Sequence, residues 1–234
     1  MLAFLKNHPF AVEAHFEYSL VLTYAVPKSD LISLIPECLS VDNFDDHWGF
    51  VAIALVSTRV LRPKGFPRFL GNDFFLAGYR IFVNYHTSKG KRLRGLYILK
   101  SETDKKKMEF FGNMFTHYQY STTDIHFQRR DDHILVESQN SHLNIDVALS
   151  ESEINLPQSS PFHDWKEARR YAGPLPFTIT YQQKTREILI IEGVREHWTP
   201  RPVEVIKANV GFMNHPQFSR AVLANAFVIE NIPY

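Results

Sequence analysis

The feature that most constrains the fold is a run of alternating residues between His15 and Val26. Apolar side chains stand at every second position, and the positions between them are mostly polar in the first half of the run. A period of two residues places the apolar side chains on one face of a β-strand. The run therefore predicts a long, half-buried strand. A second stretch, "FVAIALV" at 50–56, is apolar and rich in β-branched residues, and it predicts a second strand.

Helices are expected to be few and short. The segment "SETDKKKMEFFGNMF" predicts one to three helical turns, with Ser101 or Thr103 as the N-cap. A further short helix is expected to start near Ser160 and Pro161. Many long strands without regular strand–helix alternation predict a mainly β fold that is mostly antiparallel and closed into a barrel or sandwich. Closed barrels of this kind often hold a small-molecule cavity.

The connections indicate one domain. Residues 79–99 predict a hairpin whose turn contains Lys89 and Gly90, because glycine accepts the left-handed conformation of such turns. The polar segment "SESEINLPQSS" at 150–160 predicts a connecting loop. We therefore expect residues 1–234 to form a single domain, with 15–149 and 175–230 in one continuous β system.

Charge and cysteine content exclude several classes of protein. The chain has 26 Lys and Arg against 25 Asp and Glu, and the basic residues are scattered, so we expect no nucleic-acid partner and no anionic membrane partner. The single cysteine, Cys38, excludes an intramolecular disulfide and favours a reducing cytoplasm. The N-terminal "MLAFLKNHPF" has too short an apolar run for a signal sequence, and no later run is long enough to span a bilayer.

Five segments, taken in order, resemble a known family. They are "LIPECLSVDNFDDHWGFVAIALVSTRVLRPKGFP", "FFLAGYRIFVNY", "GLYILKSETD", "WKEARRYAGPLPFTITYQQ" and "VREHWTPRPVEV". The chain resembles, over residues 15 to 230, the YqjF-like family of uncharacterised bacterial proteins, also called the domain-of-unknown-function 2071 family. That family is similar in fold to acetoacetate decarboxylase. The resemblance implies a large, mostly antiparallel closed barrel with an interior pocket.

The resemblance also implies where a decarboxylase would carry its nucleophile. Acetoacetate decarboxylase forms a Schiff base through a buried lysine whose pKa is lowered by a neighbouring lysine. By order along the chain, that pair would fall near "GNMFTHYQY", where this sequence has Thr116, His117 and Tyr118. No lysine occurs between Lys107 and Lys166. The lysine pair of the decarboxylase is therefore missing from the matching segment.

A glutamate that the decarboxylase uses would fall in "NDFFLAGYRIFVNY", yet there is no carboxylate between Asp73 and Glu102. Lys100 and the run of lysines at 105–107 are expected to be ordinary solvated lysines. We therefore expect no Schiff-base chemistry and no cofactor.

A different set of residues lies on the strands that the resemblance places around the pocket: Arg80, Tyr97, His117, Tyr118 and Tyr120. An arginine beside tyrosine hydroxyls suits a small carboxylate or another polar, planar ligand. In the alternative interpretation, Tyr97 and Tyr118 are core aromatics whose hydroxyls reach the surface, and Arg80 is a cation on a strand face.

Three functional hypotheses follow. In the first, the protein binds a small organic carboxylate or carbonyl compound without Schiff-base chemistry. In the second, it is an enzyme that acts on such a compound by acid–base catalysis, with His117 or Tyr118 as the proton carrier. In the third, it has a structural role, and side chains fill the interior.

Other chemistries have weaker support. Four histidines, at positions 117, 126, 133 and 142, suggest a metal set at first sight. The nine-residue spacing within each pair places its members on opposite faces of a straight strand, and two imidazoles alone make a poor zinc site. We therefore expect no metal. No Gly-x-Ser-x-Gly motif occurs, which disfavours a hydrolase of that type.

Overall fold

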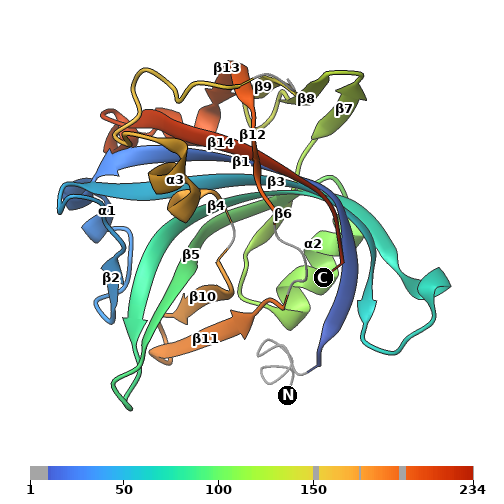
Figure 1. The fold of residues 1–234 in the computed structure, drawn as a ribbon. Helices are drawn as coiled ribbons and strands as arrows, with labels where there is room; N and C mark the ends of the chain where they lie inside the picture. Colours follow the sequence, from blue (N-terminus) through green and yellow to red (C-terminus); the bar gives the residue numbers. More distant parts are fainter. Residues whose placement is uncertain (1–9, 150–152, 174, 195–198, 234) are drawn as a thin grey trace.

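The computed structural model describes residues 10–149, 153–173, 175–194 and 199–233, and most of them lie in two β-sheets (Figure 1). The larger sheet has ten strands. Its main order is β11 (Glu187–Glu192), β10 (Phe177–Gln182), β5 (Arg92–Thr103), β4 (Asn72–His86), β3 (Trp48–Pro63), β1 (Val12–Pro27), β14 (Val222–Pro233) and β12 (Arg201–Pro202). Two short strands pair outside this order, β2 (Leu39–Val41) with β4 and β6 (Tyr120–Thr122) with β5.

The smaller sheet has four strands in the order β13 (Glu204–Val210), β9 (Leu143–Ala148), β8 (His133–Ser138) and β7 (His126–Arg130). The helices are short. They are α1 (Lys28–Ile32), α2 (Lys106–Phe115), α3 (Trp165–Ala168) and the 3₁₀ turns η2 (Arg68–Leu70), η3 (Arg169–Tyr171), η4 (Gly211–Asn214) and η5 (Pro216–Phe218). No described helix is long and apolar enough to cross a lipid bilayer.

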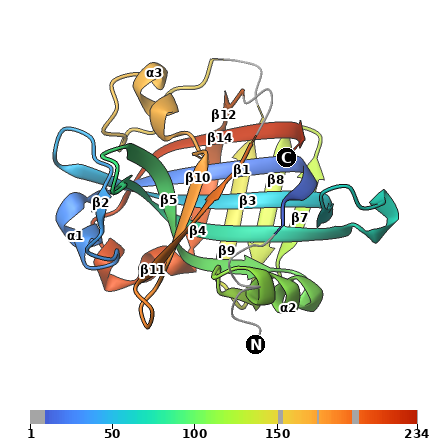
Figure 2. The ribbon, with the colours of Figure 1, turned by 90° about the horizontal axis from the view of Figure 1, so that it is seen from below.

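Strand pairing confirms a mainly β, mostly antiparallel fold, but the predicted closed barrel is not confirmed. The long strands β5, β4, β3, β1 and β14 run side by side as antiparallel neighbours (Figure 2). The order ends at β11 on one side and at β12 on the other, and no pairing joins these ends among the described residues. The four-stranded sheet instead packs against one face of the large sheet. Its Ile134, Val136 and Ile145 share a hydrophobic cluster, here called cluster 1, with Leu20 and Ile53 of the large sheet.

Strand β1 carries the predicted alternation, but its second half is buried on both faces. Leu20 and Leu22 belong to cluster 1, whereas Val21 lies in a second cluster on the opposite face, here called cluster 2. The segment around α3 and η3 covers that opposite face, and the Thr23 hydroxyl donates a 2.8 Å hydrogen bond to the Tyr171 carbonyl. The half-buried prediction is therefore wrong for this half, because a distant segment supplies the second cover.

Helix positions differ from the predictions, whereas the hairpin is confirmed. Ser101 and Thr103 lie inside β5 instead of capping a helix, and α2 begins at Lys106 without a side-chain cap. The later helix starts at Trp165, after residues 160–161, because the Asp164 carboxylate accepts the hydrogen bond that caps it. Gly90, with φ of +77°, lies in the turn between β4 and β5.

Two sequence features fall outside the described residues: the N-terminal residues 1–9 and the family-like "EHW" at 196–198. Cys38 is exposed and is not in a disulfide.

Candidate functional site

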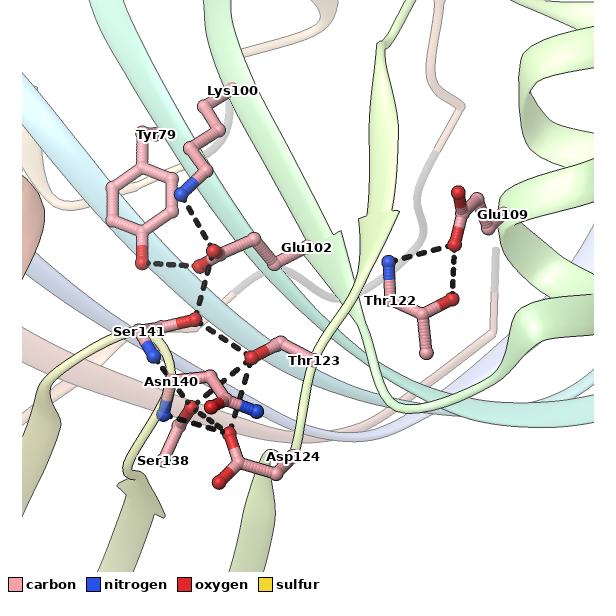
Figure 3. Close-up of polar contacts among 10 residues, drawn as sticks. All are labelled: Tyr79, Lys100, Glu102, Glu109, Thr122, Thr123, Asp124, Ser138, Asn140 and Ser141. Atoms are coloured by element: carbon pink, nitrogen blue, oxygen red, sulfur yellow. Dashed lines mark hydrogen bonds and ion pairs between the residues drawn. The ribbon is translucent and has the colours of Figure 1, made fainter.

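One buried polar group of the interior is the carboxylate of Glu102, which is only 3% exposed. A buried carboxylate is costly unless donors surround it. Three side chains supply them (Figure 3). The Tyr79 hydroxyl donates to Oε2 at 2.8 Å, the Ser141 hydroxyl donates to Oε1 at 2.8 Å, and Lys100 Nζ lies 2.6 Å from Oε1. We call these four residues the Glu102 site.

The register between β4 and β5 positions three members of the site. Tyr79 is paired with Lys100, and Glu102 is paired with Ala77, so these side chains leave the sheet on the same face. This is the face covered by cluster 1, to which Ala77 and Tyr79 belong. The Tyr79 ring packs on Phe212 of η4 with 4.4 Å between ring centroids. The site therefore lies between the two sheets.

Tyr79 is a neutral hydrogen-bond donor. Its side chain is 1% exposed, and burial, reinforced by the charge of Glu102, raises the pKa of Tyr79 far above its usual value. The phenol thus keeps its proton and stabilises the carboxylate beside it.

Lys100 differs from its buried neighbours because 41% of its side chain is exposed. An ammonium group has three N–H donors, and Glu102 accepts one of them. Its Nζ also lies 5.7 Å from the centroid of the Tyr79 ring. The predicted ordinary solvated lysine is therefore wrong in one respect, because a buried carboxylate fixes the position of this ammonium.

A chain of hydroxyls connects the Glu102 site to the smaller sheet. The Thr123 hydroxyl lies 2.9 Å from Ser141 Oγ and 3.3 Å from Ser138 Oγ. Ser138 in turn donates to Asp124 at 2.6 Å. This bond and two backbone N–H groups of the β8–β9 turn, at residues 139 and 140, lower the pKa of Asp124 to about 2. Asp124 is therefore a carboxylate at neutral pH, and it fixes the turn that carries Ser141.

Helix α2 is tied to β6 next to this chain. The Glu109 carboxylate accepts hydrogen bonds from the backbone N–H of Thr122, at 2.8 Å, and from its hydroxyl (Figure 3). The Asn113 amide bonds the backbone of Tyr120 in both directions, at 2.7 and 2.8 Å. These contacts position the segment 116–118 that connects α2 and β6.

The residues predicted to line a pocket do not share one face of the large sheet. Arg80 is paired with Ala52, which belongs to cluster 2, whereas Tyr97 is paired with Ile81, which belongs to cluster 1. Arg80 and Tyr97 thus point to opposite faces. The Arg80 Nε atom is buried and has no hydrogen-bond partner among the described residues.

The other three predicted residues lie in two places. Tyr118 and Tyr120 pack in cluster 2, with 5.9 Å between their ring centroids. His117 lines a small cavity of about 240 Å³ together with Thr180 and Glu187, at the pair β10–β11.

A cavity of about 1140 Å³ lies at the smaller sheet. Of the four histidines considered as a metal set, His126 and His142 line it, whereas His133 Nδ1 is 2.7 Å from Asp146. That contact raises the pKa of His133. Across the described part of the chain, no three His, Cys, Asp or Glu residues are close enough together to hold a metal ion.

Sequence reasoning missed the Glu102 site. The polar run "SETD" resembles a helix start and therefore predicts Ser101 or Thr103 as an N-cap, although β5 continues to Thr103. The available signal was the i, i+2 spacing of Lys100 and Glu102, which places both side chains on one face of a strand. Their partners Tyr79 and Ser141 could not be found in this way, because they lie 23 and 39 residues from Glu102.

Comparison with solved structures supports the fold. An acetoacetate decarboxylase from Legionella pneumophila matches with a TM-score of 0.59 and 10% identity, over 97% of this chain and 86% of that chain. An acetoacetate decarboxylase-like enzyme from Sphingomonas wittichii RW1 matches with a TM-score of 0.56 and 11% identity, over 96% and 92%. The enduracididine biosynthesis enzyme MppR, complexed with pyruvate, matches with a TM-score of 0.51 and 9% identity, over 95% and 86%. At these identities the likeness shows an acetoacetate decarboxylase-like fold.

Comparison of sequences is more specific. No curated protein matches this chain significantly. The model of the DUF2071 family, described as an uncharacterized conserved protein, matches residues 13–229. This match confirms the family predicted from the five ordered segments: the chain belongs to the DUF2071 family.

Proposed function

We propose that this protein binds a small organic carboxylate or carbonyl compound at Lys100, without forming a Schiff base. The observation that carries the proposal is that the buried Glu102 carboxylate holds the half-exposed Lys100 ammonium in place. Both side chains lie on the face of the large sheet that cluster 1 covers. Tyr79 and Ser141 already bond the Glu102 carboxylate, and Lys100 balances its charge. An incoming ligand oxygen can therefore accept from the N–H donors of the ammonium that Glu102 does not use.

The surroundings of Lys100 argue against an imine. Imine formation needs an uncharged amine, and enzymes obtain one by desolvating the lysine or by placing another cation beside it. Lys100 is half-exposed and is ion-paired with a carboxylate instead. It is the only lysine of β5, and the three strands that pair with β5, namely β4, β6 and β10, contain none. A second lysine is therefore missing from these neighbouring strands.

Titration calorimetry with pyruvate and with acetoacetate tests this binding. We expect saturable binding to the wild-type protein and at least ~10-fold weaker binding to Lys100→Met, because a hydrogen bond to a charged group contributes about 1.5–3 kcal/mol. Lys91→Met, in the exposed β4–β5 turn, is the matched control and should bind like the wild type. Equal affinities of Lys100→Met and the wild type would refute the proposal.

A second candidate function, acid–base catalysis, is favoured by one observation: His117 lines the 240 Å³ cavity together with Glu187. An imidazole that faces a cavity can carry a proton near neutral pH. The geometry favours His117 over Tyr118, because Tyr118 packs against cluster 2.

Cluster 1 contains residues of both sheets, which supports our proposal that residues 1–234 form a single domain. The free Cys38 fits the reducing cytoplasm that we propose as the protein's compartment.

A further inference from the structure

We infer that the 1140 Å³ cavity at the smaller sheet is a second binding site, and that its ligand is a neutral, polyhydroxylated small molecule such as a saccharide. The first argument is a row of polar side chains that crosses all four strands. His126 on β7 is paired with Glu137 on β8, Glu137 with Asn144 on β9, and Asn144 with Asn209 on β13. Directly paired residues project from the same face, so these four side chains stand next to one another.

The row has the dimensions of an extended ligand. Neighbouring strands lie about 4.8 Å apart, so four strands place the first and last side chains roughly 14 Å apart. All four residues belong to the lining of the cavity, as do Met213 and Asn214 of η4 and Tyr24 of β1. His126, Glu137 and Asn209 are exposed, so the row is open to solvent. Burial raises the pKa of Tyr24 to about 12, so its phenol is a neutral donor.

Hydrogen bonds hold the end of the cavity in place. His142, which lines it, has φ of +48°, a conformation that is uncommon for a residue other than glycine. The Gly211 backbone N–H donates to the His142 carbonyl at 3.0 Å. A Cβ on Gly211 would lie 2.7 Å from the His142 Cβ, so glycine is needed for this close approach. The Asp124 bonds described above fix the other side of the same turn.

The charges of the lining select the ligand class. Among the described residues, the lining contains the carboxylates of Asp124 and Glu137 and no lysine or arginine. An anionic ligand would be repelled by the two carboxylates and would meet no lysine or arginine of the described lining. The oxygens of Asp124 already accept hydrogen bonds from Ser138 and from two backbone N–H groups. A cationic ligand would therefore depend mainly on the exposed Glu137, and such surface pairs contribute little.

Hydroxyl groups match the remaining partners. Glu137 accepts hydrogen bonds, Tyr24 donates, and the carboxamides of Asn144 and Asn209 do both. A simple carbonyl compound can only accept and would leave Glu137 without a donor. A polyol both donates and accepts along its whole length, as the polar side chains of the row require.

The test is an NMR titration with maltose, with galacturonate as the anionic probe and glucosamine as the cationic probe. We expect maltose to shift the side-chain amide signals of Asn144 and Asn209, and the double variant Asn144→Val/Asn209→Val to bind it at least ~10-fold more weakly. Gln128→Val is the matched control, since this exposed amide of β7 does not line the cavity. Lys100→Met should also leave maltose binding unchanged, which separates this site from the proposed carbonyl site.

Three results would overturn the inference: binding of glucosamine or galacturonate without maltose, no shift with maltose at any soluble concentration, or full maltose affinity in the double variant. Thermal unfolding of the double variant, compared with Gln128→Val, checks that weaker binding does not reflect loss of the fold.

Discussion

Replacing Asp42 by alanine is expected to lower the free energy of unfolding by about 4 kcal/mol, as is typical when one partner of a buried ion pair is removed. The Asp42 side chain is 1% exposed, and it accepts hydrogen bonds from Arg94 Nε and, at 3.3 Å, from Asn84 Nδ2. Arg92 lies 3.6 Å away. Without the carboxylate, Arg94 would keep its charge against the Tyr171 ring, 4.8 Å from its centroid, with no counterion among the described residues.

Urea unfolding of Asp42→Ala measures this loss. Asp132→Ala is the matched control because its side chain is 78% exposed, and it should change stability by less than about 0.5 kcal/mol. A loss below about 1 kcal/mol for Asp42→Ala would mean that solvent screens the pair as it screens surface ion pairs.

Replacing Glu102 by alanine is expected to lower the free energy of unfolding by about 3 kcal/mol. The Tyr79 hydroxyl would lose its acceptor in a place where Tyr79 is 1% exposed, and an unsatisfied buried donor costs about 1–3 kcal/mol. Ser141 would lose the same acceptor, and the missing side chain would leave a void. Lys100 contributes less to the loss, because water can solvate its half-exposed ammonium.

The same urea measurement, together with Glu102→Gln, separates these contributions. Glutamine keeps the shape and one acceptor oxygen, so we expect it to cost less than alanine. Glu37→Ala, at an exposed position, is the control. Wild-type stability of Glu102→Ala would show that the carboxylate does not organise its three partners.

Much of the fold could be predicted because its signals are local. The alternation in β1 and the glycine in the β4–β5 turn each act within a few residues, and the strand and the hairpin turn that they predict are both present. A closed barrel would need the edge strands β11 and β12 to pair with each other. No local sequence pattern shows whether two such distant strands pair. The burial of both faces of β1 likewise depends on Tyr171, 148 residues from Thr23.

The Glu102 site was harder to predict for the same reason. A strand-end "KSET" and a helix cap look alike in sequence, because serine, threonine and acidic residues favour helix starts. The two differ in the structure because the smaller sheet buries this end of β5, and the β8–β9 turn of that sheet supplies Ser141 as a partner of Glu102. Arg80 and Tyr97, in contrast, are predicted site residues that the structure does not bring together. Both lie on the central strands, but their register places them on opposite faces, and a one-residue difference decides this.

The measurement that tests the central claim most directly is the intact mass of the protein after incubation with acetoacetate or pyruvate and then borohydride. An ordinary lysine, with a pKa near ~10.4, is almost fully protonated at neutral pH and does not form an imine. We predict that the mass stays unchanged while calorimetry still detects binding that depends on Lys100. A stoichiometric reduced adduct that maps to one lysine, Lys100 above all, would contradict the account.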